Sequence, residues 1–270
     1  MTEFDVAGVG VWSEHFSSWE QFCSVLAGDV SPEPCALKPE TIPANERRRA
    51  PLSVKMAVEV MDQACRSAGL EPAGLATVFA SVYGDIQITD YMCRTLASAP
   101  RAVSPTKFHN SVHNASTGYW SMATQAHGPA NAISAYSCSA SMALLEGAVQ
   151  AVEESIPVLV AMQEMASLTA FKPIYDTEQA LSTALVLVPP GSCASAFATV
   201  RLATSGDSHD YPDLPATADI DWSDNFAAKM LPFLQVLATP GESRLHMPLS
   251  AHSSMSLDVT VHGAAEQARA

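Results

Sequence analysis

Asn131-Ala-Ile-Ser-Ala-Tyr-Ser-Cys138-Ser-Ala-Ser-Met-Ala-Leu-Leu-Glu-Gly-Ala148 is the stretch that says most about the fold. A strand is predicted from Asn131 to Ser137 and a helix from Ser139 to Val152, with Cys138 at the junction. A thiol at a helix N-terminus lies near unpaired amide donors and the positive end of the helix dipole, and both stabilise a thiolate. Cys138 is therefore a candidate nucleophile. The alternative is a buried cysteine that only fills space in a tight turn.

Short apolar runs alternate with helical patterns on both sides of this stretch. Further strands are predicted over 5–11, 77–82, 157–162, 184–188, 196–203 and 256–261, and helices over 19–27, 51–68, 86–97, 117–126 and 225–238. Buried parallel strands read as continuous apolar runs, and strands that alternate with helices form layered α/β folds. The order predicts an α/β fold whose sheet is mixed, mostly parallel, and covered by helices.

Composition and charge narrow the function. Lys and Arg number 14 and Asp and Glu number 28, so the formal net charge of the 270 residues is −14. A surface with this charge does not suit nucleic acid or an anionic membrane. The acidic start, Met1 to Asp5, lacks the features of a signal peptide, and no apolar run reaches the length of a membrane span. A cytoplasmic protein is expected.

The cysteines lie at positions 23, 35, 65, 93, 138 and 193, without a CxxC pair. This spacing does not favour a zinc ribbon or a redox motif, and free thiols are expected. Residues 204–224 contain six aspartates but no lysine or arginine. They are interpreted as a surface linker between a main part, 1–203, and a short remainder, 225–270. The tail from Gly263 is expected to be frayed.

Ser137-Cys138-Ser139-Ala140-Ser141 resembles the active-site region of the β-ketoacyl synthases, which are thiolase-fold condensing enzymes. Other segments resemble the family in the same order along roughly residues 4 to 200. They are the opening strand with its Trp-containing helix, 104–114, Gly128-Pro129, 158–164, and 173–176 with the strand after it. The resemblance implies a thiolase-like fold.

Two histidine motifs of the second half of those enzymes are not found in this sequence. The resemblance therefore implies essentially one half of the fold with a short C-terminal remainder. This sequence is similar to the short β-ketoacyl-synthase-like proteins of aryl polyene and xanthomonadin-type pigment pathways. Those proteins share Arg47 to Arg49, Phe108 to Asn114, and Gly118 to Trp120 with this chain.

This resemblance implies a chain-length-factor-like subunit of type II fatty acid or polyketide biosynthesis. Its partner would be a full-length ketosynthase, in a heterodimer, or a second copy, in a homodimer. It would need no cofactor of its own, because the substrate is carried on the phosphopantetheine of an acyl carrier protein. Half of a thiolase fold is expected to expose apolar sheet and helix surface that the partner covers.

Cys138 departs from this subfamily, which commonly lacks the nucleophile. A second hypothesis is therefore a self-sufficient cysteine-dependent acyltransferase or thioester hydrolase. A third is a non-catalytic homodimer that binds acyl chains.

His109 and His113, four residues apart, would share a face of a helix. Either imidazole is a candidate base for Cys138, or the two order a loop beside the active site or dimer interface. No third ligand suggests a metal site.

The remaining candidates rest on the resemblance. Arg47, Arg48 and Arg49 are either a solvated run or a contact for the acyl carrier protein or its phosphate. Candidates for lining an acyl tunnel are Tyr136, Met162 and Phe171. Glu164 is interpreted as a hydrogen-bonded structural carboxylate, and Asp176 as a residue that orders its loop.

Overall fold

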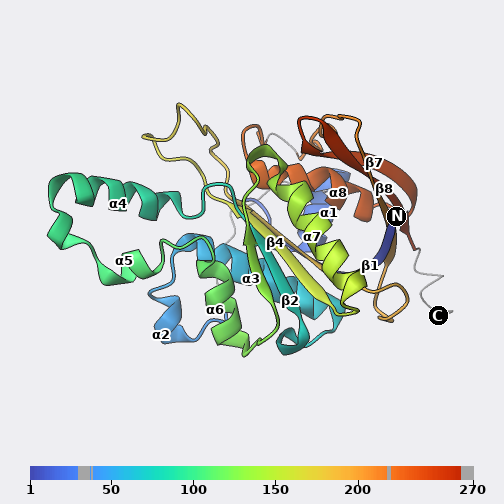
Figure 1. Ribbon diagram of the computed structural model, residues 1–270, viewed down its shortest axis with the longest axis horizontal. Coiled ribbons are helices and arrows are strands. Elements are labelled where there is room, and N and C mark those ends of the chain that lie inside the picture. The colour runs from blue at the N-terminus through green and yellow to red at the C-terminus, as the bar shows by residue number, and fades with distance from the viewer. Residues whose placement is uncertain (30–36, 38, 218–219, 263–270) are drawn as a thin grey trace.

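An eight-stranded sheet forms the centre of the molecule (Figure 1). The computed structural model describes residues 1–29, 37, 39–217 and 220–262. The order of the strands across the sheet is β3-β2-β4-β5-β1-β6-β8-β7. Their bounds are β1 Thr2–Ser13, β2 Ala76–Ala80, β3 Ala130–Ile133, β4 Val158–Glu164, β5 Leu181–Val188, β6 Ala198–Ser205, β7 Gly241–Ser250 and β8 Ser253–Val261.

Helices cover the sheet. The α-helices are α1 Trp19–Ala27, α2 Ala44–Arg47, α3 Leu52–Ala68, α4 Ile86–Ser98, α5 Pro105–His109, α6 Ala115–Thr124, α7 Ser139–Glu153 and α8 Leu231–Leu237. Short 3-10 turns are η1 Pro72–Gly74, η2 Pro100–Ala102, η3 Tyr136–Cys138 and η4 Phe226–Met230. The bounds predicted for α1, α3, α4 and α7 agree with the structure to within one or two residues.

The predicted α/β fold with a mixed sheet is confirmed, but the share of parallel pairing is not. Strand β2 runs parallel to β3 and to β4, whereas β1, β5, β6, β7 and β8 all pair antiparallel. The error has a physical reason. Every residue of β5 is buried because helices cover both faces of the strand. A continuous apolar run therefore reports burial on both faces and carries no information about direction.

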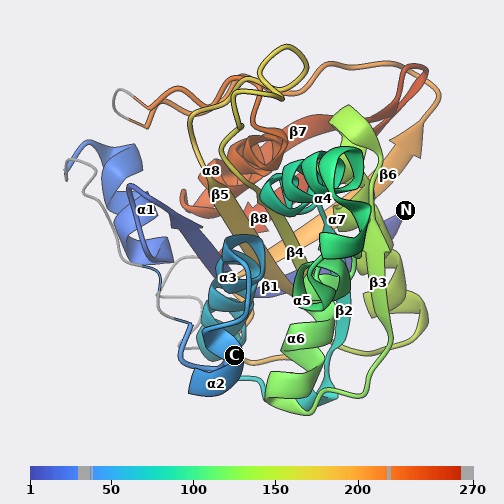
Figure 2. The ribbon, with the colours of Figure 1, turned by 90° about the vertical axis from the view of Figure 1, so that its left-hand side faces the viewer.

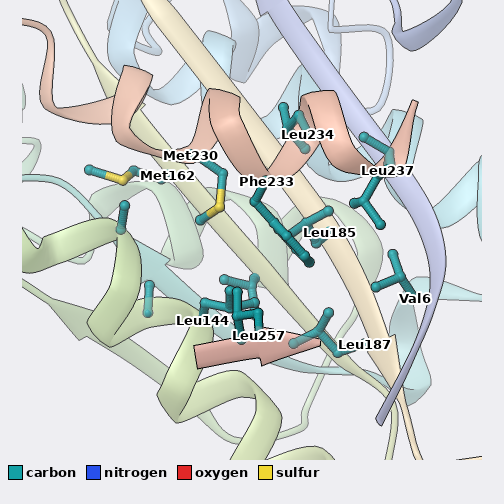
Figure 3. Close-up of a cluster of buried hydrophobic side chains, with 14 of the residues drawn as sticks. Val6, Leu144, Met162, Leu185, Leu187, Met230, Phe233, Leu234, Leu237 and Leu257 are labelled. Atoms are coloured by element: carbon teal, nitrogen blue, oxygen red, sulfur yellow. The ribbon is translucent and has the colours of Figure 1, made fainter. Parts of the chain in front are cut away.

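The core lies in two layers, one on each face of the sheet. On one face α7, η4 and α8 pack over Val6, Leu185, Leu187 and Leu257 (Figure 3). On the other face, α3 and α6 contribute the layer. Helix α3 lies close to β1, and a Cβ atom on Gly10 would stand 2.0 Å from the carbonyl oxygen of Val60. Gly10 therefore sets the spacing between α3 and the sheet.

The stretch 204–224 is not a free surface linker where the structure describes it. Trp222 and Thr217 are buried, and Tyr211, Leu214 and Ile220 pack against the core. The six aspartates made the composition of this stretch typical of an exposed linker. Its apolar and aromatic side chains nevertheless pack against the core. Strands β7 and β8 then join the same sheet through β6. The division into 1–203, 204–224 and 225–270 remains a prediction.

Three further expectations concern the cysteines, the C-terminal tail and membrane spans. The cysteines at 23, 65, 93, 138 and 193 are free thiols, and Cys35 lies outside the described residues. The tail from Gly263 also lies outside them. No helix in the described ranges is long and apolar enough to cross a membrane.

Candidate active site at Cys138

Cys138 lies at the predicted junction. It ends η3 and forms the N-cap position of α7, and its side chain is half-buried. The turn before it is tight, since Tyr136 has a φ of 50°, in the left-handed region. The Ser139 hydroxyl holds this turn by accepting from the Ala135 amide at 2.9 Å and donating to the Tyr136 carbonyl at 2.8 Å. The strand-to-helix geometry therefore places the thiol where the sequence predicts it.

A cavity of about 560 Å³ opens beside this thiol. Cys138 and Ser137 form one side of it. The strap, by which we mean residues 208–214 of the acidic stretch, also lines the cavity. Lys229 of η4, Pro248 and Ser250 of β7, and Ala251 of the turn after it complete the described lining. The site is thus assembled from the segment around the cysteine and from three segments beyond residue 204.

Tyr211 anchors the strap over the start of α7. Its hydroxyl lies 2.9 Å from the Ser141 hydroxyl, which also donates to the Pro248 carbonyl. Because a serine has one hydroxyl proton and that carbonyl can only accept, Tyr211 donates to Ser141. Burial raises the pKa of Tyr211 to about 12. The Lys229 ammonium lies 5.4 Å from the centre of the Tyr211 ring, which adds a cation–π contact.

The two candidate histidines, His109 and His113, lie on α5 and on the turn between α5 and α6. His113 places Nε2 2.7 Å from the Ser81 carbonyl oxygen and packs near the Phe79 ring. His109 is exposed at the end of α5. Helix α5 ends before His113 and α6 begins after it, so the two imidazoles are not on one helix. Neither histidine is among the described residues that line the Cys138 cavity.

The three candidates for an acyl tunnel are not brought together. Met162 is buried in the core beneath α7 and η4 (Figure 3). Tyr136 is exposed and its ring lies 5.1 Å from that of Phe226. Phe171 is half-buried in a turn after β4. None of the three is among the described residues of the cavity.

The arginine run lies at the end of α2. Arg47 is half-buried and donates to the Pro39 carbonyl at 3.2 Å, and Arg48 donates to the Asn45 side chain. Arg48 and Arg49 are exposed. Two guanidinium groups are therefore turned toward solvent, an arrangement that suits a solvated run as well as an acidic partner.

Glu164 at the end of β4 is a hydrogen-bonded buried carboxyl, as predicted. It accepts from the Ser81 hydroxyl at 3.2 Å and from the Val82 amide. Burial raises the pKa of Glu164 to about 8. Asp176 pairs with Lys172 at 3.1 Å within its loop.

Sequence reasoning missed His209, Tyr211 and Lys229. The His209 ring lies 4.3 Å from the ring of His246, on β7. These residues stand about 70 to 110 positions from Cys138 in the sequence, so no local spacing joins them to it. The one available signal was the presence of Tyr211, Leu214 and Trp222 in a stretch otherwise typical of a linker.

Solved structures of ketosynthases and chain length factors share this fold. A ketosynthase in complex with its chain length factor, from Xenorhabdus doucetiae, matches with a TM-score of 0.69 at 19% identity, over 96% of this chain and 99% of that chain. The ishigamide ketosynthase/chain length factor matches with a TM-score of 0.75 at 12% identity, over 97% and 100%. A type II polyketide acyl-carrier protein in complex with its ketosynthase matches with a TM-score of 0.74 at 10% identity, over 97% and 100%.

The mixed sheet and the cysteine between strand and helix thus define a ketosynthase-like α/β protein. A match to a protein-family model narrows this class to one family. The chain belongs to the β-ketoacyl synthase, N-terminal domain family, whose model matches residues 17–239. The search of curated proteins finds no match.

Proposed function

We propose that this chain is a chain-length-factor-like subunit that pairs with a full-length ketosynthase in type II fatty acid or polyketide biosynthesis of the aryl polyene type. Family membership supports the proposal. So does the fold, which it shares with proteins solved as ketosynthase/chain length factor complexes. The aryl polyene assignment rests on the sequence resemblance.

The observation that carries the pairing is the uneven protection of the two sheet edges. Strand β7, at one edge, bears the charged side chains of Glu242 and Arg244 and contains Pro248. Charges and proline are devices that protect an edge from pairing. Strand β3, at the other edge, consists of Ala130-Asn-Ala-Ile133 and its first three residues are exposed. It has neither charge nor proline, so it is the edge open to a partner strand.

Exposed apolar side chains gather on the elements beside that edge. Phe108 at 63%, Val112 at 53% and Met122 at 64% exposure lie on α5, on the turn after it, and on α6. Helix α6 contacts β3, and Figure 2 shows α5 and α6 on the side of the molecule on which β3 lies. Apolar residues clustered at a free edge are typical of an interface.

The outer face of β6, β8 and β7 does not need such cover. Glu3, Arg201, Asp258 and Arg244 form a row of alternating charge across β1, β6, β8 and β7. Arg201 pairs with Glu3 at 2.6 Å, and Arg244 pairs with Asp258. Half of a thiolase fold was expected to expose apolar sheet surface. For these strands that expectation is wrong, because their outward positions are polar.

Co-expression with full-length type II ketosynthases tests the pairing. We expect a stable one-to-one complex on size exclusion with light scattering. Val112→Asp places a charge in the apolar surface beside β3 and should abolish the complex. Val149→Asp, on α7, is the matched control at an exposed apolar position and should leave the complex intact. A chain that forms only a homodimer, or remains a monomer with every ketosynthase, would overturn the proposal.

Carrier-protein binding is a separate element of the proposal. Arg48 and Arg49 are the exposed guanidinium groups that suit an acidic carrier protein or the phosphate of its phosphopantetheine arm. Because the chain carries a net charge of −14, the ketosynthase is expected to supply the main docking surface.

A second candidate function is cysteine-dependent acyl transfer or thioester hydrolysis by the chain itself. The cavity beside Cys138 favours it, because a thiol that only fills a tight turn needs no open space in front of it. Sequence reasoning pairs this thiol with His109 or His113.

A further inference from the structure

A third histidine, in the strap, shares the cavity with the candidate nucleophile. We propose that His209 is the proton acceptor for the Cys138 thiol, and that the cavity accepts uncharged acyl thioesters. This inference rests on the second candidate function, cysteine-dependent acyl transfer, and is independent of pairing with a ketosynthase.

His209 and Cys138 both line the cavity of about 560 Å³, whereas His109 and His113 do not. The volume lies in the range of small-molecule sites. An imidazole is the side chain best suited to take a proton near neutral pH. His113 has one ring nitrogen engaged by the Ser81 carbonyl, directly after β2. Of these three histidines, His209 is therefore the one that shares the cavity with the cysteine.

Two contacts hold His209 in place. Its ring packs against the His246 ring at 4.3 Å with the planes tilted by 30°. Two residues further along the strap, Tyr211 is fixed through Ser141, which lies in the first turn of α7 and three residues after Cys138. The strap and the thiol are thus tied to the same helix terminus, and a base held in this way keeps its position relative to the nucleophile.

The charges of the lining indicate the class of acyl group. Lys229 is the cation of η4, and it lies over the Tyr211 ring. Asp210 and Asp213 of the strap line the same cavity. Two carboxylates against one ammonium do not favour an anionic ligand. We therefore expect simple acyl chains to be accepted and malonyl groups, which carry a carboxylate, to be rejected.

The step is a thioester exchange. The Cys138 thiol gives its proton to His209, and the sulfur attacks the acyl carbon. A bond forms between Cys138 Sγ and that carbon, and the bond from the carbon to the sulfur of the donor thioester breaks. The leaving thiolate takes the proton from His209. The products are acyl-Cys138 and a free thiol, with no oxidant, reductant or metal involved.

Acylation by a small thioester tests the proposal on the full chain. The protein is incubated with hexanoyl-N-acetylcysteamine or with malonyl-N-acetylcysteamine, and the acyl adduct is followed by intact mass and peptide mapping. We expect a hexanoyl adduct at Cys138 that is lost in Cys138→Ala. His209→Asn should slow its formation by about 10²- to 10⁴-fold. His252→Asn, an exposed histidine next to the cavity residues, is the matched control and should keep the wild-type rate.

His113→Gln should also keep that rate, and circular dichroism should show that each variant is folded. An unchanged rate in folded His209→Asn would overturn the role of His209. So would a rate that falls in His113→Gln instead, or the lack of any adduct on the wild-type chain. Malonyl transfer as fast as hexanoyl transfer would overturn the ligand class. A chain that pairs with a ketosynthase but is not acylated would lose this inference and keep the proposed function.

Discussion

Gly147 of α7 lies so close to Val160 of β4 that a Cβ atom on the glycine would stand 2.2 Å from Val160 Cγ2. The same atom would lie 3.3 Å from Leu187 Cδ1, on β5. Both neighbours belong to central strands of the sheet, so neither can move without disturbing the core. Since Cys138 is the N-cap of α7, this close approach sets how deep the thiol sits.

We expect Gly147→Ala to destabilise the protein by about 1–3 kcal/mol, the usual cost of overpacking a filled core. Gly118→Ala is the matched control, because Gly118 is also helical and a Cβ atom there meets nothing within 4 Å. It should stabilise α6 by roughly 0.5–1 kcal/mol. Urea unfolding of both variants measures the difference. Equal effects of the two substitutions would show that α7 tolerates a shift away from the sheet.

Glu164 should make stability fall as pH rises. Its pKa is raised from the ordinary value of 4.5 to about 8 because the carboxyl is buried. Between about pH 4.5 and about pH 8 the folded protein holds a proton that the unfolded chain releases. The stabilisation is complete below this window and lost above it. Thermal unfolding across the window measures the slope.

Glu164→Gln removes the titrating group and keeps an oxygen that can accept from the Val82 amide. The variant should therefore lose stability less steeply than the wild type as pH rises. Glu14→Gln, at an exposed glutamate, is the control and should follow the wild type. Parallel curves for wild type and Glu164→Gln would show that the carboxyl is ionised in the folded protein.

Asp85, the N-cap of α4, joins this helix to α3. One carboxylate oxygen accepts from the Ile88 amide at 2.8 Å and caps α4, and the other accepts from the Ser53 hydroxyl at 2.6 Å. Losing such a cap costs about 0.5–2 kcal/mol, so Asp85→Ala should speed amide exchange in the first turns of α4 by roughly two- to thirtyfold. Asp90→Ala removes only the exposed pair with Arg94 and should change exchange little. Amide hydrogen exchange followed by mass spectrometry measures these rates. Similar rates in the two variants would contradict the role of the cap.

The elements with strong local signals were predictable from the sequence. Ser18 caps α1, and Gly69 ends α3 with a φ of 66°, so residue type alone marks these ends. Strand β7 was missed because its first four residues are exposed and polar, without the apolar run that marks a buried strand. The position of Cys138 followed from the turn around it, whereas its neighbours His209 and Lys229 come from tertiary folding, which no local pattern encodes.

The exposed edge of β3 yields the sharpest test of the pairing surface. The Pro129 carbonyl accepts from the Thr77 amide, and the Ile133 carbonyl accepts from the Ser81 amide. Because backbone groups alternate in direction along a strand, the amide of Ala132 faces away from β2 and toward the open edge. The Ala132 amide is thus available to a partner strand.

Ala132→Pro removes this outward donor without removing a bond to β2, and proline is tolerated on edge strands. We expect the variant to fold with nearly the wild-type melting temperature and to lose the ketosynthase complex. Ala132→Val keeps the amide and suits a strand, so it should keep both. Light scattering reports the complex and circular dichroism reports the fold. If Ala132→Pro retains full binding, the partner is held by the apolar side chains of α5 and α6 and not by strand pairing, because the backbone of β3 would then contribute no bond that proline can remove.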